Sequence, residues 1–368
     1  MIERRAFSFG LGAALLATAA KAEIRYNGAD LDVRERKPLK KLPYTPLEKV
    51  PNHREIMRGI IQELARYCHA HAPRMAVLVR NAPELALKGR REWQWQAWRN
   101  PRGEANGSLS PMGSINNDYV EAIDGVLIDG MFTGREVYGQ PTKQAESAYL
   151  LTEAQAVKSL GRPVFSIEYG ADGAHKALTA KTAKDEGFLF WFDNEGDKRL
   201  GTIPAKLPDD ENPDHIGALS EAKNFLVMSE SDGFVSRSAW VKALAETNYD
   251  VLIVNPFWNG RDPLNYEDMQ ALKFKKLGAR RMVLAEMSVG RALEGAYYWK
   301  EEWKEGNPSW LFAKDPLVGS QWVVEYWSDD WKKIMGEYVV AAAKLGFDGI
   351  LLNHADSYIL FEDMMPID

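Results

Sequence analysis

The segment GVLIDGMFTGREVYGQPTKQAESAYLLTEAQAVKSLGRPVFSIEY (125–169) contains one complete structural repeat of the chain. It opens on the apolar run GVLIDGMF (125–132) and closes on a second run, PVFSIEY (163–169). Near-continuous apolar runs are typical of strands that are covered on both faces, as in a parallel sheet. The stretch TKQAESAYLLTEAQAVKSLG (142–161) has a helical pattern and ends on a basic turn followed by glycine. The segment therefore predicts a strand, a helix and a second, parallel strand.

The same rhythm extends over most of the chain. Eight apolar runs occur in all, namely MAVLVRN (75–81), GVLIDGMF (125–132), PVFSIEY (163–169), GFLFWFDN (187–194), NFLVMSES (224–231), DVLIVNPFW (250–258), RMVLAEMSVG (281–290) and DGILLNHADSY (348–358). Helical stretches separate most of them, and eight alternations predict an α/β fold of the closed (β/α)₈ TIM-barrel type. An open doubly wound sheet is the structural alternative. The first strand is not followed by a glycine-rich phosphate turn, which weakens a dinucleotide-binding version of that alternative.

The order of elements predicts how the ring closes. The first element is an amphipathic helix, NHREIMRGIIQELARYCHAHAP (52–73), and the last is a strand, whereas such barrels normally begin with a strand. We therefore expect the helix at 52–72 to pack between the last strand and the first, with the two ends of the domain close together, as in a circular permutation. A single barrel domain is predicted over 52–362.

The N-terminus predicts export. Residues 1–22, MIERRAFSFGLGAALLATAAKA, combine an arginine pair, a short apolar run and a small-residue cleavage pattern near Ala22. This is typical of a secretory signal, and the pair Arg4 and Arg5 with Phe7 resembles the twin-arginine type. The run is too short for an ordinary transmembrane helix, so we expect a periplasmic or secreted protein with no membrane span in the mature chain. Residues 23–51 are polar and proline-dotted, and they predict an extended leader.

Composition narrows the classes of partner. The net charge is -6 and the basic residues form no block, which gives no reason to expect a nucleic-acid partner. The single cysteine, Cys68, lies in an apolar helical stretch and is expected to be a small buried hydrophobe. Histidine and cysteine show no metal-ligand spacing, so we expect neither a metal nor a cofactor.

Polar residues at the strand ends predict the site, because barrel enzymes act at the C-terminal ends of their strands. These positions hold Asn81, Asp129, Glu168, Asp193, Glu230, Asn255, Glu286, Asn353 and Asp356. Several carboxylates at one mouth, without a metal motif or a nucleophilic Ser or Cys signature, indicate glycoside hydrolysis by paired acids. Asp and Glu at strand ends also cap helices or pair with arginine, and Asp193 has the setting of a turn residue.

Aromatic residues predict where a sugar would stack. They are densest after the seventh strand, in ALEGAYYWKEEW (292–303), which we interpret as an enlarged functional loop. A second enlarged loop, 82–118, carries Trp93, Trp95 and Trp98, which can line the opposite wall. The candidate substrate-binding residues are Asn81, Tyr169, Asn255, Trp258, Arg291, Tyr298, Trp299, Asn353 and Tyr358.

Four segments carry a family resemblance. They are ARRMVLAEMSVGRALEGAYYW (279–299), PSWL (308–311), QWVVEYWSDDW (321–331) and GFDGILLNHADSY (346–358). In order and spacing they resemble the glycoside hydrolase family 114-like barrels, also labelled cysteinyl-tRNA-synthetase-related, whose characterised members are endo-α-1,4-polygalactosaminidases. MAVLVRNAPEL (75–85), DGVLIDGMF (124–132) and PVFSIEY (163–169) resemble the other half of that family, which comes second there and first here. The resemblance implies the same barrel with its halves in permuted order.

The chain departs from the family at several acids. Asn353 and Asn255 stand where the family has aspartate, whereas Asp356 keeps the second aspartate of its L-D-x-x-D pattern. Asp129 matches a family glutamate and Glu168 a family aspartate. In addition, Arg291 replaces an acid or amide, and Glu286 stands where the family usually has an aromatic residue. An amide cannot ionise, so it cannot act as nucleophile or base.

Two functions follow from these residues. The first is an exported glycosidase that cleaves a galactosamine-containing polysaccharide, with Asp356 and Asp129 as acid and base and Glu168 or Glu286 as replacement. The second is a catalytically impaired barrel that binds polysaccharide or an envelope partner. The carboxylates favour the enzyme, and the two asparagines with Arg291 favour the binding protein.

Overall fold

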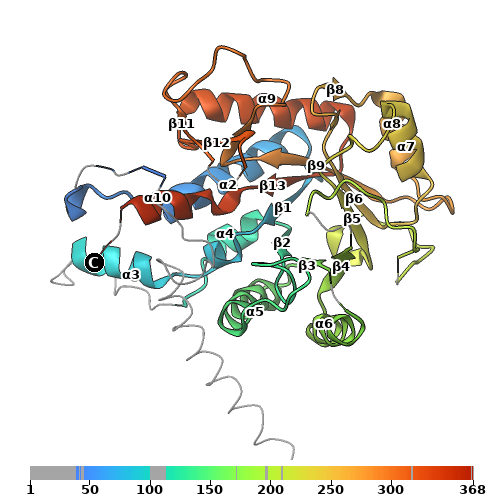
Figure 1. The fold of residues 1–368 in the computed structure, drawn as a ribbon, viewed down its shortest axis with the longest axis horizontal. Coiled ribbons are helices and arrows are strands. Elements are labelled where there is room, and N and C mark those ends of the chain that lie inside the picture. The colour runs from blue at the N-terminus through green and yellow to red at the C-terminus, as the bar shows by residue number, and fades with distance from the viewer. Residues whose placement is uncertain are drawn as a thin grey trace, which may run out of the picture.

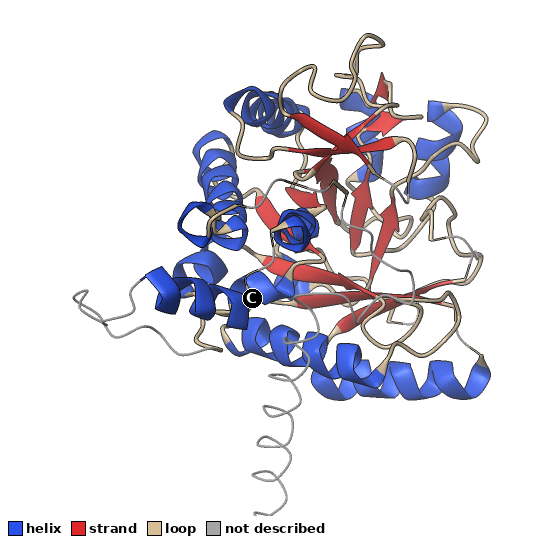
Figure 2. Ribbon diagram, turned by 60° about the vertical axis from the view of Figure 1, so that its left-hand side comes forward, coloured by secondary structure: helices blue, strands red, loops and turns tan. Residues whose placement is uncertain are grey.

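A computed structural model describes residues 39, 40, 42, 45–99, 113–170, 172–194, 198–208, 210–315, 318–365 and 367. Its main sheet has eight strands, and helices flank this sheet on the outside (Figures 1 and 2). These strands are β1 (Ala76–Arg80), β2 (Gly125–Asp129), β3 (Val164–Tyr169), β4 (Leu189–Asp193), β5 (Phe225–Met228), β6 (Val251–Val254), β9 (Met282–Ser288) and β13 (Gly349–Asn353). The eight apolar runs of the sequence each supply one of them, so the predicted strands are confirmed.

The helices of the described residues are α2 (His53–His71), α3 (Arg90–Arg99), α4 (Asn117–Ala122), α5 (Gln144–Ser159), α6 (Gly173–Glu186), α7 (Arg237–Ala245), α8 (Tyr266–Leu272), α9 (Asp329–Leu345) and α10 (Tyr358–Met364). The helices predicted at 52–72 and 142–161 are confirmed, whereas α3 and the start of α4 lie in the stretch predicted as an enlarged loop and α10 follows the strand predicted to be the last element. Short 3₁₀ turns are η1 (Leu47–Lys49), η2 (Pro83–Ala86), η3 (Leu219–Glu221) and η4 (Ala355–Ser357). Gly187 and Gly346 end α6 and α9 at φ 66° and 92°, as expected for glycine in a left-handed cap.

The eight strands form a nearly closed barrel. Their order is β4-β3-β2-β1-β13-β9-β6-β5, and every neighbouring pair is parallel. Consecutive strands along the chain are therefore neighbours, and β1 pairs with β13, as in a TIM-like barrel. β4 and β5 are the two edges of the sheet. The predicted closed ring is thus formed except for a ladder at this one seam.

Aromatic packing spans the seam between β4 and β5. The ring of Phe225 on β5 lies edge-on to Trp191 of β4 and to Phe165 of β3, with centroids 6.4 and 5.1 Å apart. The connection from β4 to β5 has no α-helix in its described part. Three prolines at 204, 208 and 213 explain this, because each removes a backbone donor and clashes with the preceding turn.

The first helix lies where the element order predicts. α2 packs against α9, which precedes β13, and against α4, which precedes β2. It therefore covers the seam where β13 pairs with β1. Arg54 of α2 also forms an ion pair with Glu362 of α10, at 3.1 Å, so the two ends of the domain lie together.

Aspartates mark the opposite, N-terminal end of the barrel. Asp124, Asp250 and Asp348 each directly precede a strand and accept a hydrogen bond from a backbone N–H near the start of a neighbouring strand. The donors are Val77, Lys223 and Val283, at 2.7 to 2.9 Å. These carboxylates hold the strand register, which distinguishes them from the acids at the mouth.

Two smaller sheets extend the loops at the mouth. β7 (Phe257–Trp258) and β8 (Asp262–Pro263) form a hairpin after β6. β10 (Arg291–Leu293), β11 (Leu311–Lys314) and β12 (Gln321–Val324) form a three-stranded antiparallel sheet between β9 and α9. The predicted enlarged loop after the seventh strand is therefore a small ordered sheet.

Several predictions concern the ends and the surface. The signal over 1–22 and most of the leader over 23–51 lie outside the described residues. None of the helices described is long and apolar enough to cross a membrane.

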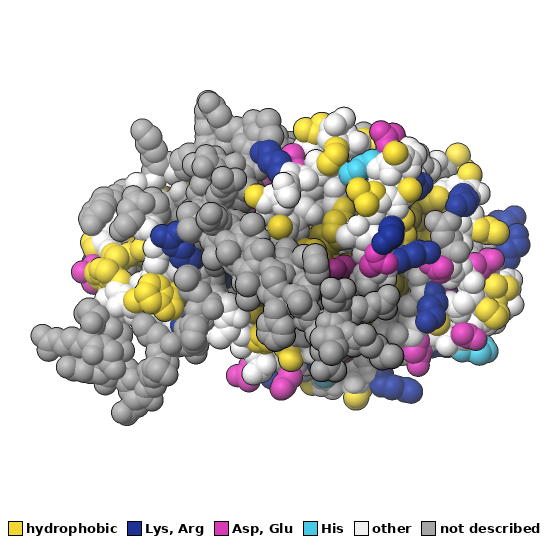
Figure 3. Space-filling view, turned by 90° about the horizontal axis from the view of Figure 1, so that it is seen from below, with side chains coloured by type: hydrophobic (Ala, Val, Ile, Leu, Met, Phe, Trp, Pro, Cys, Tyr) yellow, Lys and Arg dark blue, Asp and Glu magenta, His cyan; other side chains and the backbone are white. Residues whose placement is uncertain are grey.

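Cys68 is fully buried, as predicted, and burial raises the pKa of its thiol to about 12. On the face in Figure 3, basic and acidic side chains of the described residues are interspersed.

Candidate active site

Arg80 lies at the centre of the barrel mouth. It is the last residue of β1, and its Nη2 lies 2.9 Å from an oxygen of Asp129, the last residue of β2. Its Nη1 donates to Glu286 Oε1 of β9 at 3.2 Å, and its Nη2 donates to the Tyr169 hydroxyl at 3.3 Å. Burial opposes the charge of Arg80, but Asp129 and Glu286 outweigh this and raise its pKa. One buried guanidinium thus joins two acids from different sides of the barrel.

Each of these two acids also contacts an asparagine amide. Asn81 Nδ2 donates to Asp129 Oδ2 at 2.6 Å, and Asn81 Oδ1 accepts from the Asp129 backbone N–H at 2.9 Å. Asn81 has a φ of 58°, a left-handed conformation that asparagine tolerates better than most residues. Asn353 Nδ2 donates to Glu286 Oε1 at 2.7 Å. The structure therefore brings together five of the candidate site residues, namely Asn81, Asp129, Tyr169, Glu286 and Asn353.

A cavity of about 310 Å³ opens beside Glu286. It lies beyond the ends of β5, β6 and β9 and contains three predicted residues, Asn255, Glu286 and Tyr298. Its described lining includes two carboxylates, Glu230 and Glu286, and neither lysine nor arginine. Asp129 and Asp356 are not part of this lining.

Glu230 is the second acid of the cavity. It follows β5 by two residues, and burial raises the pKa of its carboxyl. Arg199 works against that rise, whereas the nearby charges of Asp232 and Glu286 add to it. Glu286, by contrast, accepts hydrogen bonds from Arg80 and Asn353 on the same oxygen. Two carboxyl groups on one cavity therefore stand in different surroundings, the arrangement that separates an acid from a base.

Aromatic rings form one wall of the cavity. Phe257 and Tyr297 are stacked with centroids 4.7 Å apart, and Tyr338 lies 6.4 Å from each of them. Tyr298 accepts a hydrogen bond from the Leu293 N–H, and its ring meets Trp331 edge-on at 5.6 Å. These flat apolar faces suit the C–H face of a sugar ring.

Other predicted site residues have contacts that serve the fold. Glu168 is fully buried and accepts from the backbone N–H groups of Phe132 and Thr133 and from the Ser166 hydroxyl. Burial raises the pKa of its carboxyl to about 8. Arg291 forms an ion pair with Asp315 at 3.1 Å and donates to the Ser357 hydroxyl. These two side chains fix loops around the mouth.

The remaining aromatic and acidic candidates lie further out. Trp299 packs against Trp303 and Trp322, and Trp258 lies on β7; neither is part of the cavity lining. Asp356 is half-buried on η4, directly after β13. The sequence setting of Asp193 indicated a turn. The structure shows instead that Asp193 is the buried last residue of β4.

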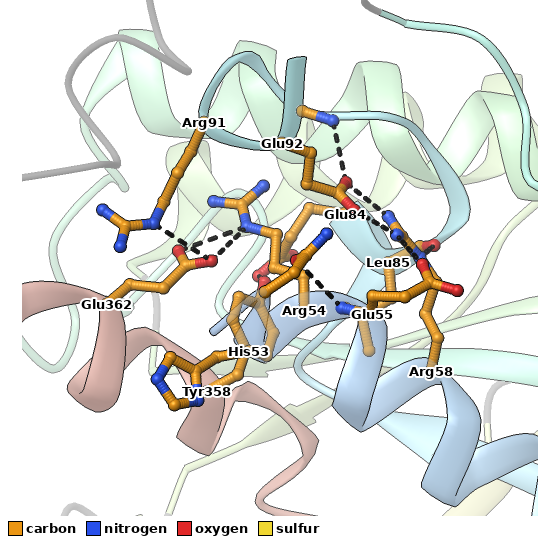
Figure 4. Close-up of polar contacts among 12 residues, drawn as sticks. His53, Arg54, Glu55, Arg58, Glu84, Leu85, Arg91, Glu92, Tyr358 and Glu362 are labelled. Carbon is orange, nitrogen blue, oxygen red and sulfur yellow. Dashed lines mark hydrogen bonds and ion pairs between the residues drawn. The ribbon is translucent and has the colours of Figure 1, made fainter. Parts of the chain in front are cut away.

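Tyr358 belongs to a separate buried network, drawn in Figure 4. Its hydroxyl donates to Glu84 at 2.5 Å, and the Arg54 guanidinium lies 5.3 Å from its ring centre. Arg54 of α2 pairs with Glu362, and Arg58 of α2 pairs with Glu92 of α3. All four residues are labelled in Figure 4. This network holds α2, η2, α3 and α10 together. Tyr358 therefore stabilises the place where the two ends of the domain meet.

The sequence placed Glu230 at a strand end without giving it a role, and it did not single out Arg80 or Tyr338. Glu230 stood among the strand-end acids, but a single residue gives no sign that its carboxyl shares a cavity with Glu286. Arg80 sits at a strand end as well, directly before Asn81. Its place at a strand end, like that of the acids, was the sign in the sequence that it could belong to the site. Within the described residues, no group of His, Cys, Asp and Glu is arranged to hold a metal ion.

Comparison with known proteins gives relatives without an assigned activity. No family model matches the chain. It is 26% identical over 175 residues to an uncharacterised protein of Methanocaldococcus jannaschii, which covers 47% of this chain and 49% of the relative. Uncharacterised proteins of Thermotoga maritima (26% over 140 residues, 36% of this chain and 43% of the relative) and Deinococcus radiodurans (27% over 118 residues, 32% and 37%) are also similar. The chain thus spans half or less of the length of these relatives.

Proposed function

We propose that the protein is a glycosidase that uses Glu230 as general acid and Glu286 as nucleophile or base. The observation that carries this proposal is the shared cavity, on which two carboxyl groups stand in different surroundings. Glycoside hydrolysis needs one carboxylic acid to protonate the leaving oxygen and one carboxylate on the other side of the bond. Glu230, with its raised pKa, suits the first role. Glu286, bonded to Arg80 and Asn353, suits the second.

The remaining groups of the mouth orient this pair. Asp129, to which Asn81 donates, accepts a hydrogen bond from the Arg80 guanidinium, which in turn donates to the Glu286 carboxylate. Asn255 and Tyr298 line the cavity, where an amide and a ring can bind sugar hydroxyls and a ring face. In keeping with the sequence, we propose a polysaccharide substrate containing galactosamine, an export signal over 1–22, and a domain that is circularly permuted relative to the family 114-like barrels.

The test is hydrolysis of galactosamine-containing polysaccharide by the purified protein, measured as new reducing ends. We expect Glu230→Gln and Glu286→Gln each to lower kcat by about 10² to 10⁴-fold, because each removes one proton-transfer or nucleophilic group. Glu63→Gln, on the exposed side of α2, is the matched control and should keep full activity. If both cavity variants stay active while Asp129→Asn and Asp356→Asn do not, the sequence-predicted acids are the catalytic pair instead.

The pH profile gives an independent check. Glu230 must be protonated to act as the acid, and burial raises its pKa. Activity should therefore persist above the usual titration range of glutamate and fall as pH rises through the raised pKa. The falling limb should vanish in Glu230→Gln for substrates with an activated leaving group, which needs no proton.

A binding function is the second candidate. The observation that favours it is the pair of amides at Asn255 and Asn353, where the family-like pattern has acids. Binding of polysaccharide without any release of reducing ends, weakened by Tyr298→Ala, would support an impaired barrel that binds sugar or an envelope partner.

A further inference from the structure

A second hollow lies behind the aromatic wall of the cavity. This groove has a volume of about 420 Å³ and runs between α9 and the β7–β8 hairpin, which lie next to each other in Figure 1. Its lining consists of Pro256, Phe257, Pro263, Leu264, Tyr297, Glu337, Tyr338, Ala341, Ala342, Lys344, Leu345 and Phe347. We refer to it as the apolar groove.

The apolar groove and the cavity share one wall. Phe257, Tyr297 and Tyr338 line both spaces, and their rings contact one another. Tyr297 is 42% exposed, so one side of this wall reaches the surface. The two spaces therefore adjoin along a wall that includes an exposed ring, over which the proposed substrate would extend.

The groove adjoins the segment that carries the proposed acid. The loop that carries Phe257 is tied to the segment after β5, because the Asn259 N–H donates to the Ser231 hydroxyl at 2.8 Å. Ser231 directly follows Glu230 in the chain. A general acid must stand next to the leaving oxygen, so the part of the substrate that leaves should extend toward this loop.

The chemistry of the groove does not suit a sugar. Four of its described lining residues carry polar side-chain atoms, namely Tyr297, Glu337, Tyr338 and Lys344. Glu337 and Lys344 are exposed, and the Tyr338 hydroxyl already donates to the backbone oxygen of Glu286. The other eight lining residues are apolar, so a sugar ring lying against them would leave hydroxyl groups without partners, which costs binding free energy, whereas an alkyl or aryl group would not.

We propose that the apolar groove binds an apolar aglycone, so that the substrate is a galactosamine-containing glycan whose reducing end carries an alkyl or aryl leaving group. The inference rests on the proposed glycosidase activity and specifies the substrate class of that same site. It assigns the cavity to the sugar that is released and the groove to the lipid-like or aromatic group that leaves with the oxygen protonated by Glu230.

The test is a chain-length series of alkyl galactosaminides and galactosides, of both anomers, from methyl to octyl. Each methylene that enters the groove should raise kcat/KM roughly four-fold, equivalent to ~0.8 kcal/mol, until the groove is full. Ala341→Trp fills the groove from the exposed side of α9 and should abolish this slope. Ala177→Trp, exposed on α6, is the matched control and should keep the slope.

The outcomes separate the inference from the proposed function. Hydrolysis with the same kcat/KM for every chain length overturns the inference and leaves the glycosidase intact. If no glycoside is cleaved, 1-butanol, 1-hexanol and 1-octanol are titrated while tryptophan and tyrosine fluorescence is followed. Affinity that rises with chain length and is lost in Ala341→Trp supports an apolar site, and affinity unchanged by Ala341→Trp overturns it. A change of oligomeric state in Ala341→Trp would assign the groove to a second copy of the chain instead.

Discussion

Arg80 balances the charge of the barrel mouth at the scale of a single residue. Its guanidinium contacts two carboxylates, and its side chain is 8% exposed. Removing one partner from such a buried set leaves the others without compensation, which is more costly than losing a surface ion pair.

We expect Arg80→Gln to lower the free energy of unfolding by about 3 to 5 kcal/mol, because Asp129 and Glu286 would then face each other unpaired. Urea unfolding followed by circular dichroism measures this. The surface pair of Lys181 with Asp185 offers the contrast, since Lys181→Gln should cost below about 1 kcal/mol. A loss as small for Arg80→Gln would show that water reaches the mouth and screens the acids.

Glu168 predicts a pH dependence of stability. Its pKa of about 8 in the folded protein lies above the ordinary value of about 4.3, so between these values the folded state holds a proton that the unfolded chain has released. Stability contributed by this group is therefore full below about pH 4 and decreases, by at most ~1.4 kcal/mol per pH unit, up to about pH 8. In Glu168→Gln that decrease should disappear.

Unfolding midpoints at pH 5, 6.5 and 8 test the Glu168 prediction. Glutamine can accept from the Phe132 and Thr133 N–H groups through its oxygen and donate to the Ser166 hydroxyl, so the variant keeps these contacts. Glu63→Gln on the surface should leave the slope unchanged. An equal slope in the parent and in Glu168→Gln would mean that Glu168 is already ionised at pH 5.

The site could be predicted from the sequence in part, because strand ends converge whatever their neighbours are. This rule placed Asp129, Glu286 and Asn353 at one mouth. It could not tell that Glu168 turns into the structure to accept three hydrogen bonds, or that Tyr358 reaches Glu84. Side-chain direction depends on packing by residues far apart in the chain, and a single strand does not contain that information.

At the scale of elements, β9, β10 and η4 meet at Gly290. A Cβ at this position would lie well inside contact distance of the Ser357 side chain and of the His354 carbonyl oxygen. η4 carries Asp356, and its Ser357 is bonded to Arg291. The close approach at Gly290 therefore fixes where η4 sits above the last strand.

We expect Gly290→Ala to destabilise the protein by about 1 to 3 kcal/mol, because η4 must shift to admit the methyl group. Gly59→Ala provides a matched substitution inside α2, where nothing lies within 4 Å of the new Cβ. That change should stabilise by up to ~1 kcal/mol, since alanine favours a helix more than glycine does. Thermal unfolding of both variants is the measurement, and equal midpoints would contradict the close-approach argument.

The elements themselves were well specified by sequence pattern. Apolar runs gave the strands, and glycine stops gave the ends of α6 and α9. The small sheet of β10, β11 and β12 was expected only as an enlarged loop. Its strands are three or four residues long, and its hydrogen-bond partners lie up to about thirty residues apart, so periodicity is too short to indicate it.

At the scale of the whole molecule, the number and order of strands followed from counting, but the open seam between β4 and β5 did not. A ladder requires two strands of matching length and register, and β5 has only four residues. Apolar content shows that both runs are buried, whereas pairing depends on where the long connection between them leads.

The export signal predicted over residues 1–22 determines where the whole protein is delivered. Replacing Arg4 and Arg5 by lysine should leave the folded protein in the cytoplasm of a producing bacterium, because a twin-arginine signal needs both guanidinium groups. Cell fractionation with immunoblotting measures this, and N-terminal sequencing of the exported form should begin near Glu23. Periplasmic protein in equal amount from the lysine pair would show that a different route, or none, reads the segment.

The ion pair between Arg54 and Glu362 brings the first and last helices of the described domain close enough to be joined by a linker. A short linker joining the residues beside this ion pair, combined with new termini between β4 and β5, would cut none of the seven ladders of the main sheet. Such a rewired chain would begin at β5 and place Glu230 and Glu286, the two acids of the cavity, within its first seventy residues. The same seam between β4 and β5 is where we expect the chain to tolerate the break of a split-protein reporter or an inserted domain.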